Sequence, residues 1–217
     1  PVNIGVATQV SSSHLAYFGT LQNIAREKGR LIAALPEDGF AILNADDKRT
    51  LKMSEKTKAT SITYGFDTTA DIWADNLILH REARAVEGFS LKVNCDGKSV
   101  PLPLPKIVAK HHIPATLAAL AVAKALKMNL VDVVTVLENF EPLPGRLRML
   151  PGRDNTYLLD DTYNASPVST RAGLEVMGSL SAPRKIAVLG DMLELGPETE
   201  KEHAALSTAI READIHI

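Results

Sequence analysis

The sequence predicts an α/β protein in two parts, in which buried strands alternate with helices. Three observations predict this fold class. Apolar runs that end in polar residues precede amphipathic helices in the first 143 residues. Residues 89–104 read as a β-hairpin, because Asp96 and Gly97 suit a turn with positive φ. Beyond residue 143 the order becomes strand, helix, strand, helix, which predicts a parallel crossover of a doubly wound sheet.

The first part, residues 1–143, is expected to hold a mostly parallel sheet to which the hairpin is added. Thr20 is expected to cap its first helix, and Pro114 to open its second. The expected strands are at residues 4–10, 40–47, 62–66 and 71–80, and the expected helices at residues 20–35, 114–128 and 131–140.

A boundary is expected at residues 141–145 (EPLPG), where two prolines and a glycine in five residues suggest an interdomain linker. The second part, residues 144–217, is expected to open a new domain. Ser166 and Pro167 are typical of a helix cap and the first helical position. The expected strands are at residues 156–161 and 185–191, and the expected helices at residues 166–180 and 197–213.

The composition excludes several classes of protein. Of the 217 residues 45% are hydrophobic and 23% are charged, and the net charge is −2. Because both signs are interspersed, no basic surface for nucleic acid is predicted. The longest apolar stretch, residues 113–123, is about half a membrane span, so no membrane insertion is expected. A single cysteine, Cys95, and a start without signal-peptide features favour the cytoplasm.

Lys28 is the most informative single position. Leu21, Ile24, Leu31 and Leu35 recur at three-and-four spacing, and Lys28 falls on the same predicted stripe. One interpretation is a lysine that extends its ammonium to solvent. The other is a lysine inside a site, where a lowered pKa would make its amine reactive toward carbon dioxide. The resulting carbamate would offer two anionic oxygens, which suit magnesium.

Two polar residues follow predicted strands of the first part, where open α/β sheets place ligand sites. His14 lies between the first strand and the helix of Lys28, so it is a candidate for a site shared with that lysine, or an ordinary hydrogen-bonded loop residue. Asn44 belongs to the segment LNADD, whose side chains suit either a site or a helix N-cap. His111 and His112 do not share a helix face, so they do not form a metal pair.

Acidic residues end both predicted strands of the second part. Asp160 and Asp161 come before the capped helix at Ser166, where a carboxylate suits ribose hydroxyls and a helix N-terminus suits an anion. Asp191 and Glu194 repeat this arrangement, and the two loops would line one crevice if their strands were adjacent. An ordinary acidic loop explains the pattern equally well. His203 lies on an apolar helix stripe and is expected to be a satisfied, partly buried residue.

Two fingerprints are absent from the sequence. No G-x-x-x-x-G-K-[ST] motif occurs, so no P-loop for triphosphate is present, and no G-x-G-x-x-G motif supports a dinucleotide-binding dehydrogenase.

Six segments, in this order, resemble the Mur ligases. The last two are most similar to the members that join D-alanyl-D-alanine to a UDP-N-acetylmuramoyl tripeptide. The segments are TQVSSSHLAYFGTLQNIAREKGRLIAAL, AILNADD, HHIPATLAALAVAKAL, PGRL, DDTYNASP and KIAVLGDMLELG.

The resemblance implies a partial P-loop-type central ATPase domain at residues 1–143 and a partial Rossmann-like C-terminal domain at residues 144–217. It implies a monomeric, ATP-dependent amide ligase that activates a carboxylate as an acyl phosphate, which an amine then attacks. These 217 residues would be inactive alone, since the phosphate loop is missing from them. The alternatives are another Mur-type ligase and a non-catalytic module that binds nucleotide and magnesium.

The resemblance also assigns roles to residues. Lys28, as a carbamate, and His14 would bind magnesium and form the catalytic pair. Departures from the family pattern at His112 and Ala115 put adenine recognition in doubt. The expected ATP contacts are Asn44, His111, Arg146 and Asp161, and the residues expected to face the UDP-muramoyl tripeptide and D-alanyl-D-alanine are Asn164, Ser166, Asp191 and Glu194.

Overall fold

The computed structural model describes residues 2–11, 15–82 and 85–215, and their elements form two groups around two sheets. The first group comprises β1 (Ile4–Ala7), α1 (Leu15–Phe18), α2 (Leu21–Ala33), β2 (Phe40–Asn44), α3 (Lys48–Leu51), η1 (Lys52–Lys56), β3 (Thr60–Gly65), β4 (Ile72–Glu82), β5 (Ala85–Cys95), β6 (Lys98–Leu104), η2 (Lys110–His112), α4 (Ile113–Ala125) and α5 (Leu130–Leu137). The second comprises β7 (Arg148–Pro151), β8 (Tyr157–Asp160), α6 (Pro167–Ser179), η3 (Gly196–Glu198) and α7 (Thr199–Glu212).

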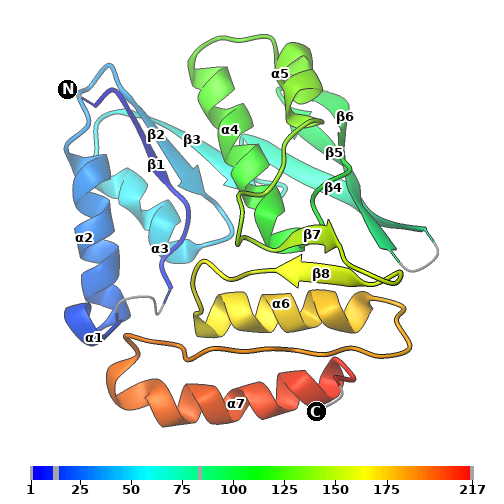
Figure 1. Cartoon of the computed structure of the whole chain (residues 1–217). Coiled ribbons are helices and arrows are strands. Elements are labelled where there is room, and N and C mark those ends of the chain that lie inside the picture. The colour runs from blue at the N-terminus through cyan, green and yellow to red at the C-terminus, as the bar shows by residue number, and fades with distance from the viewer. Residues whose placement is uncertain (1, 12–14, 83–84, 216–217) are drawn as a thin grey trace.

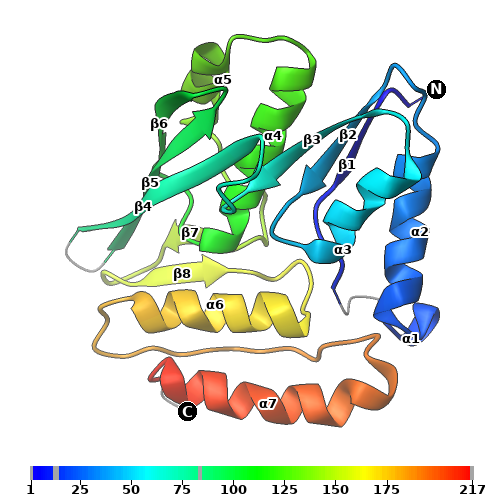
Figure 2. The ribbon, with the colours of Figure 1, turned by 180° about the vertical axis from the view of Figure 1, so that it is seen from behind.

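The larger sheet has six strands in sequence order, and helices cover both faces of its parallel half (Figures 1 and 2). Strands β1 to β4 are parallel neighbours, and β4, β5 and β6 are antiparallel. Ala41 and Leu43 pack in the core beneath α2, whereas Ile42 packs in the core beneath α4. This alternation buries β2 on both faces, as parallel strands require.

Helix α2 begins where the sequence predicts, because the hydroxyl of Thr20 accepts a hydrogen bond from the Asn23 amide at 3.1 Å. Its buried positions include Ile24 and Ile32. The predicted stripe was wrong at Leu31, which is 44% exposed. The buried face is centred nearer Ile32, because that side chain and Ile24 contact the sheet.

Strand β1 is shorter than the expected strand at residues 4–10. After Ala7 the backbone bonds to side chains instead of to β2. The Thr8 carbonyl accepts from the Asn44 amide at 2.8 Å, and the Val10 amide donates to the Asp47 carboxylate at 2.6 Å. These two bonds replace the ladder and turn the chain out of the sheet.

The predicted hairpin is confirmed as β5 and β6. Asp96 and Gly97 adopt φ of 50° and 72°, and the register pairs Cys95 with Lys98 across the turn. Strand β6 lies at the edge of the sheet and carries Pro101 and Pro103. An edge strand tolerates proline, because the amide that proline lacks has no partner there.

The second sheet differs from the prediction. Strand β8 pairs antiparallel with β7, a short strand that the sequence did not indicate, so the expected parallel crossover is wrong. Residues 185–191 form no strand. Ile186 is 58% exposed and Val188 is 95% exposed, so this segment lacks the burial on both faces that stabilises a parallel strand. Figure 1 shows it as an extended connection between α6 and α7.

The expected helices of the second group are present. Ser166 caps α6, and its hydroxyl accepts from the Ser169 amide at 3.2 Å in a capping box. Helices α6 and α7 pack through a small core that contains Leu174 and Leu206. In both views α6 lies between β8 and α7 (Figures 1 and 2).

The two groups meet through an apolar cluster. Val108 and Ala109, from the loop after β6, are buried against Leu147 and Val176. A second contact joins α1 to the loop before η3, where the Ala16 amide donates to the Glu194 carbonyl at 3.1 Å. No helix among the described residues has the length and apolar character needed to cross a membrane.

Candidate functional site

The carboxyl end of β2 carries a group of polar side chains that bond to the loops after β1 and β3. We call this group the strand-end cluster: Asn44, Asp46 and Asp47. Asn44 is 8% exposed, and its carbonyl oxygen accepts from the Asp46 amide at 3.0 Å. The Asp46 carboxylate accepts from the backbone amides of Phe66 and Asp67 at 2.9–3.0 Å. Each of these side chains therefore bonds to a neighbouring loop.

Asp47 completes this cluster and caps α3. One carboxylate oxygen accepts from the Arg49 amide at 2.8 Å, and the other accepts from Val10. The sequence allowed either a helix cap or a site for this segment, and the cap is confirmed at Asp47. The side-chain amide of Asn44 donates to the Thr8 carbonyl. The nucleotide contact predicted for Asn44 stays a prediction.

Lys28 lies on α2 near the end of β1. Its side chain is exposed although Ile24 and Ile32, one turn away on either side, are buried. Its ammonium donates to the Gln9 carbonyl at 2.9 Å. His14, the predicted partner of Lys28, lies outside the described residues. The lysine thus lies at the carboxyl end of the parallel strands, where ligand sites occur in such sheets.

Lys28 could bind the predicted magnesium ion only after conversion to a carbamate. An ammonium carries no free electron pair for a metal, so only its carbamate would supply oxygens. Within the ranges that the structure describes, no three His, Cys, Asp or Glu side chains gather as a metal site. A magnesium site at Lys28 and His14 remains a prediction.

The two groups of elements bring five side chains together, which we call the junction cluster: His111, His112, Arg146, Asp161 and Tyr163. The rings of the two histidines meet edge to face at 4.5 Å. The Arg146 guanidinium lies 3.9 Å from the centre of the Tyr163 ring. Asp161, at the end of β8, accepts from the Leu147 amide at 3.2 Å. Three of the four predicted nucleotide residues therefore meet here.

Partial burial shifts the pKa values of three groups in the junction cluster. Burial, with the nearby His111 ring and Arg146, lowers the pKa of His112 to about 4. Burial also lowers the pKa of His111, although the Asp161 carboxylate opposes this. Burial raises the pKa of Asp161, against the opposite effects of the Leu147 amide, His111 and Arg146. Both histidines are therefore neutral at pH 7.

His112 carries an unused polar atom. Its Nδ1 is buried and, among the described residues, has no hydrogen-bond partner. A buried polar atom without a partner is unfavourable by about 1–3 kcal/mol. The junction cluster therefore contains an unmet hydrogen-bonding group beside a cation and a carboxylate, which suits a polar ligand with both phosphate and hydroxyl groups.

The four residues predicted to face the acceptor and acyl substrates are spread along the second group. Ser166 uses its hydroxyl in the α6 cap, and Asn164 is exposed in the loop before it. Asp191 has an 88% exposed side chain. Glu194, at φ of 62°, lies in the loop that contacts α1. Asn164 and Ser166 share one loop, but the crevice expected between the two loops depended on adjacent strands, which are absent.

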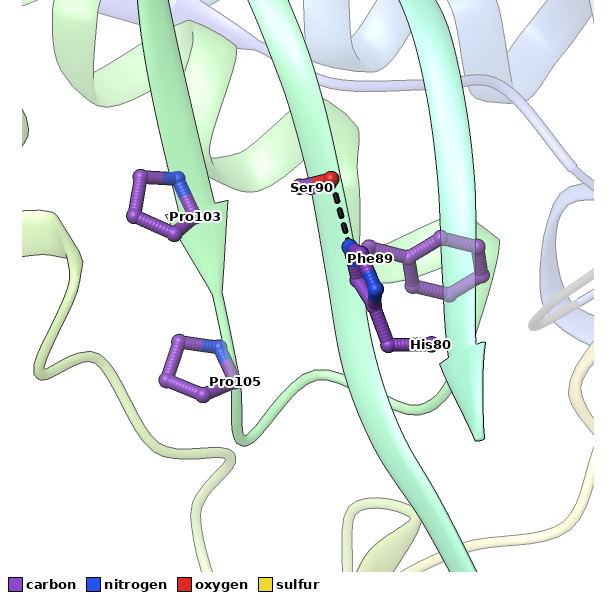
Figure 3. Close-up of a pocket in the computed structure, with 5 residues that line it drawn as sticks. All are labelled: His80, Phe89, Ser90, Pro103 and Pro105. Carbon is purple, nitrogen blue, oxygen red and sulfur yellow. Dashed lines mark hydrogen bonds between the residues drawn. The ribbon is translucent and has the colours of Figure 1, made fainter. Parts of the chain in front are cut away.

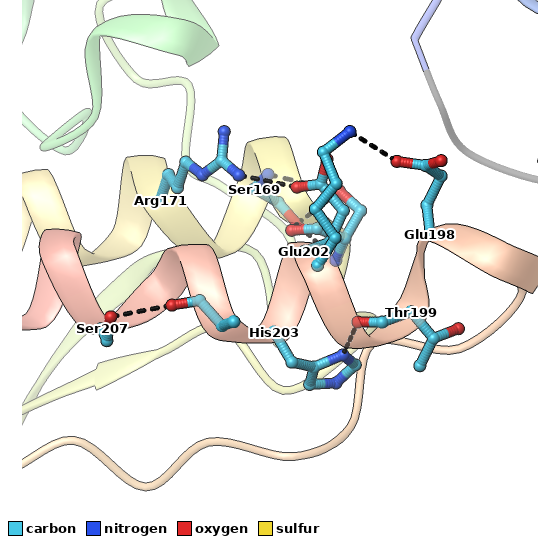
Figure 4. A network of polar contacts seen from close by, with 10 residues as sticks. Ser169, Arg171, Glu198, Thr199, Glu202, His203 and Ser207 are labelled. Atoms are coloured by element: carbon cyan, nitrogen blue, oxygen red, sulfur yellow. Dashed lines mark hydrogen bonds and ion pairs between the residues drawn. The ribbon is translucent and has the colours of Figure 1, made fainter.

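His203 confirms the prediction of a satisfied, partly buried histidine. Its Nε2 accepts from the Met192 amide at 3.0 Å, so its Nδ1 carries the proton and donates to the Thr199 carbonyl at 2.8 Å (Figure 4). Nearby, Arg171 on α6 pairs with Glu202 on α7 at 2.6 Å. The Arg171–Glu202 pair joins the two helices, and the His203 bonds attach the loop of Met192 to α7.

Two shallow pockets lie on the six-stranded group, away from both clusters. One, of about 520 Å³, is lined by His80, Phe89, Ser90, Pro103 and Pro105 (Figure 3). His80 Nε2 lies 2.6 Å from the Ser90 hydroxyl, but the lining includes no carboxylate to orient the ring. The other, of about 450 Å³, lies beside the β5–β6 turn. Neither contains a predicted site residue.

Sequence reasoning did not assign Tyr163 to the site. The signal was present, because Tyr163 stands in the same DDTYNASP segment that supplied Asp161. His112 was excluded from a metal pair and noted as a departure from the family pattern, without being assigned a role in the site. What the sequence lacked was the proximity of Arg146 to that loop.

Comparison with known proteins identifies the family. The model of the Mur ligase middle domain matches residues 1–123, and that of the Mur ligase glutamate ligase domain matches residues 145–217. The UDP-N-acetylmuramoyl-tripeptide–D-alanyl-D-alanine ligase of Escherichia coli K12 is 33% identical over 213 residues, covering 97% of this chain and 45% of that protein.

Solved structures agree with the sequence matches. A crystal structure of MurF from Acinetobacter baumannii superposes with a TM-score of 0.84 at 28% identity, covering 94% of this chain and 43% of the other. MurF ligase from Thermotoga maritima in complex with ADP shares the fold, with a TM-score of 0.83 at 23% identity, covering 97% and 47%. The chain spans somewhat less than half the length of these relatives. It belongs to the Mur ligase family.

Proposed function

We propose that this chain is the central and C-terminal portion of an ATP-dependent ligase. The ligase would join D-alanyl-D-alanine to a UDP-N-acetylmuramoyl tripeptide in peptidoglycan precursor synthesis. The E. coli relative that carries this activity in its name is 33% identical over nearly the whole chain, which supports the assignment. The boundary would lie between residues 143 and 144, and the enzyme would be a cytoplasmic monomer that binds no nucleic acid.

The observation that carries the proposal is the junction cluster. Arg146 offers a planar cation for a phosphate oxygen, and Asp161 offers a carboxylate for a ribose hydroxyl. His111 and His112 stay neutral, so they would add no charge beside the adenine ring of ATP. Arg146 and Tyr163 are exposed and therefore open to a ligand, whereas His112 and Asp161 are half-buried beside them. The cluster therefore suits a nucleotide that bridges the two parts of the chain.

We further propose that Lys28, as a carbamate, and His14 bind magnesium beside the phosphates of the nucleotide. Magnesium, when bound, would neutralise charge on phosphate oxygens during transfer to the acyl carboxylate. The position of the Lys28 ammonium at the end of β1 supports this role. Asn44 would fix the loop around it, and Asn164, Ser166, Asp191 and Glu194 would face the acceptor and acyl substrates.

The test uses the longer ligase that contains this chain. Phosphate release is measured with ATP, magnesium and the UDP-muramoyl tripeptide, against a panel of acceptor amines. The proposal predicts release with D-alanyl-D-alanine and little with single amino acids. Release with another acceptor would assign a different Mur-type ligase. Nucleotide binding without release for any acceptor would assign a non-catalytic binding module.

A further inference from the structure

Glu141 joins the two groups of elements through two cations. Its carboxylate contacts the ammonium of Lys106 in the loop after β6, and it lies 3.1 Å from the guanidinium of Arg148 at the start of β7. Among the described residues, the other ion pairs stay within one group, as Lys58 with Glu37 and Arg171 with Glu202 do. We call the three residues Glu141, Lys106 and Arg148 the Glu141 bridge.

The bridge lies beside the backbone that carries Arg146. The amides of Gly145 and Leu147 donate to Asp160 at 3.0 Å and Asp161 at 3.2 Å, which ties this stretch to the end of β8. The amide of Arg146 itself donates to the Leu143 carbonyl at 3.1 Å. Between Glu141 and this tied stretch, Leu143 is 72% exposed and Pro144 is exposed, and only Pro142 is buried.

The bridge places one carboxylate between two cations. A hydrogen bond from Lys106, followed by its charge and that of Arg148, lowers the pKa of Glu141. The carboxylate is 40% exposed, and exposed pairs add little to global stability. An exposed pair that spans two units nevertheless restricts how they move, because both cations must move with one carboxylate.

We propose that Glu141 is a positioning residue, whose bridge to Lys106 and Arg148 holds the linker so that Arg146 stays in the junction cluster. The inference rests on the proposed nucleotide role of Arg146. A merely structural role would lower global stability, whereas a positioning role alters the linker and nucleotide binding with little change in melting temperature.

The first test needs no activity. Amide exchange at Gly145, Arg146 and Leu147 is compared between this chain and its Glu141→Gln variant. We expect the exchange rate to rise by about fivefold, which corresponds to the loss of an exposed ion-pair network worth about 1 kcal/mol. The matched control is Glu37→Gln, which removes the exposed pair with Lys58 within one group and is expected to leave linker exchange unchanged. Unchanged linker exchange in Glu141→Gln overturns the proposal.

A charge reversal provides the rescue. The triple variant Lys106→Glu, Glu141→Lys and Arg148→Glu restores both pairs with opposite signs. We expect its linker exchange to return towards that of the unaltered chain. A triple variant that exchanges as fast as Glu141→Gln would show that the charges do not hold the linker, and would overturn the proposal.

The second test measures function in the longer ligase. Glu141→Gln is expected to raise the KM for ATP by about fivefold with kcat nearly unchanged. In about 1 M salt the KM values of the variant and the unaltered ligase are expected to differ less, because salt screens the bridge. Faster linker exchange without any change in KM would overturn the positioning role. If the ligase is inactive with every acceptor, the proposed function fails, but the exchange experiment still decides whether the bridge exists.

Discussion

The strand-end cluster and the junction cluster are both groups of polar side chains at the ends of strands, but they differ in how far the protein satisfies them. Asn44, Asp46 and Asp47 bond to the loops around them. In the junction cluster His112 keeps a buried atom without a described partner, and burial shifts the pKa of Asp161 upward. The bonded side chains of the strand-end cluster stabilise the scaffold, whereas His112, which lies beside a cation and a carboxylate, is the candidate for ligand contact.

The largest expected effect is on activity at the junction cluster. Replacement of Arg146 by methionine in the longer ligase should lower kcat/KM for ATP by about 100-fold, as loss of a transition-state cation does. Stability should fall by about 1 kcal/mol or less, since the contact with Tyr163 is exposed. Steady-state kinetics and thermal unfolding measure the two effects.

The control for that variant is Arg153→Met, at the exposed β7–β8 turn. It removes the same charge from the same part of the chain without touching the junction cluster. Equal losses of kcat/KM in both variants would mean that net charge, and not the position of Arg146, sets the affinity for nucleotide.

Substitution in the strand-end cluster should lower the free energy of unfolding. Asn44→Ala leaves the Thr8 carbonyl and the Asp46 amide without their partner, so it should lower the free energy of unfolding by about 1–3 kcal/mol. Asn164→Ala, at an exposed loop position of the second group, should change it by about 0.5 kcal/mol or less. Urea unfolding measures both. If the two variants lose the same stability, the strand-end cluster is not a scaffold.

The pH dependence of stability should report the junction cluster. The pKa of His112 falls from its usual 6.5 to about 4 in the folded chain. Between those values the unfolded chain binds a proton that the folded chain does not, so stability falls as pH decreases through this window. The contribution is up to about 1.4 kcal/mol per pH unit, and it is absent above pH 6.5.

The variant that tests this is His112→Asn, measured by urea unfolding at several pH values from 7 to 4. Its loss of stability on acidification should be smaller than that of the unaltered chain. His80→Asn, exposed on the six-stranded sheet, is the control and should keep the original slope. An unchanged slope in His112→Asn would contradict the burial of this ring.

The smallest expected effect concerns a predicted substrate residue that the structure uses as a cap. Ser166→Ala should lower the free energy of unfolding by about 1 kcal/mol, because the first amides of α6 lose their acceptor. Ser166→Asp should recover most of it, since aspartate caps equally well. If Ser166→Asp restores stability but not activity in the longer ligase, the hydroxyl also serves the substrate.

The sequence predicted the six-stranded group well because each element there is locally specified. Thr20 caps α2, Asp96 and Gly97 fix the hairpin turn, and apolar runs mark the parallel strands. The second group was predicted less well. Residues 185–191 have the composition of a buried strand, but a parallel strand depends on neighbours and on cover over both faces, which composition does not reveal.

The candidate site was partly predictable for a related reason. Asp161 and Arg146 stand out through their segments, but their meeting with His111 depends on how the two groups pack around Leu147 and Val108. Lys28 was placed on a buried stripe by periodicity. It is exposed although Ile24 and Ile32, one turn away on either side, are buried, and periodicity along one helix cannot express what packs around each position.

The most direct test of the account is where a nucleotide protects the backbone. Amide exchange of this chain is measured with and without ADP at concentrations up to about 10 mM, well above a millimolar dissociation constant. The account predicts protection at residues 110–112 and 145–147, with residues 44–47 unchanged. Protection confined to residues 44–47, or no protection anywhere, would contradict it.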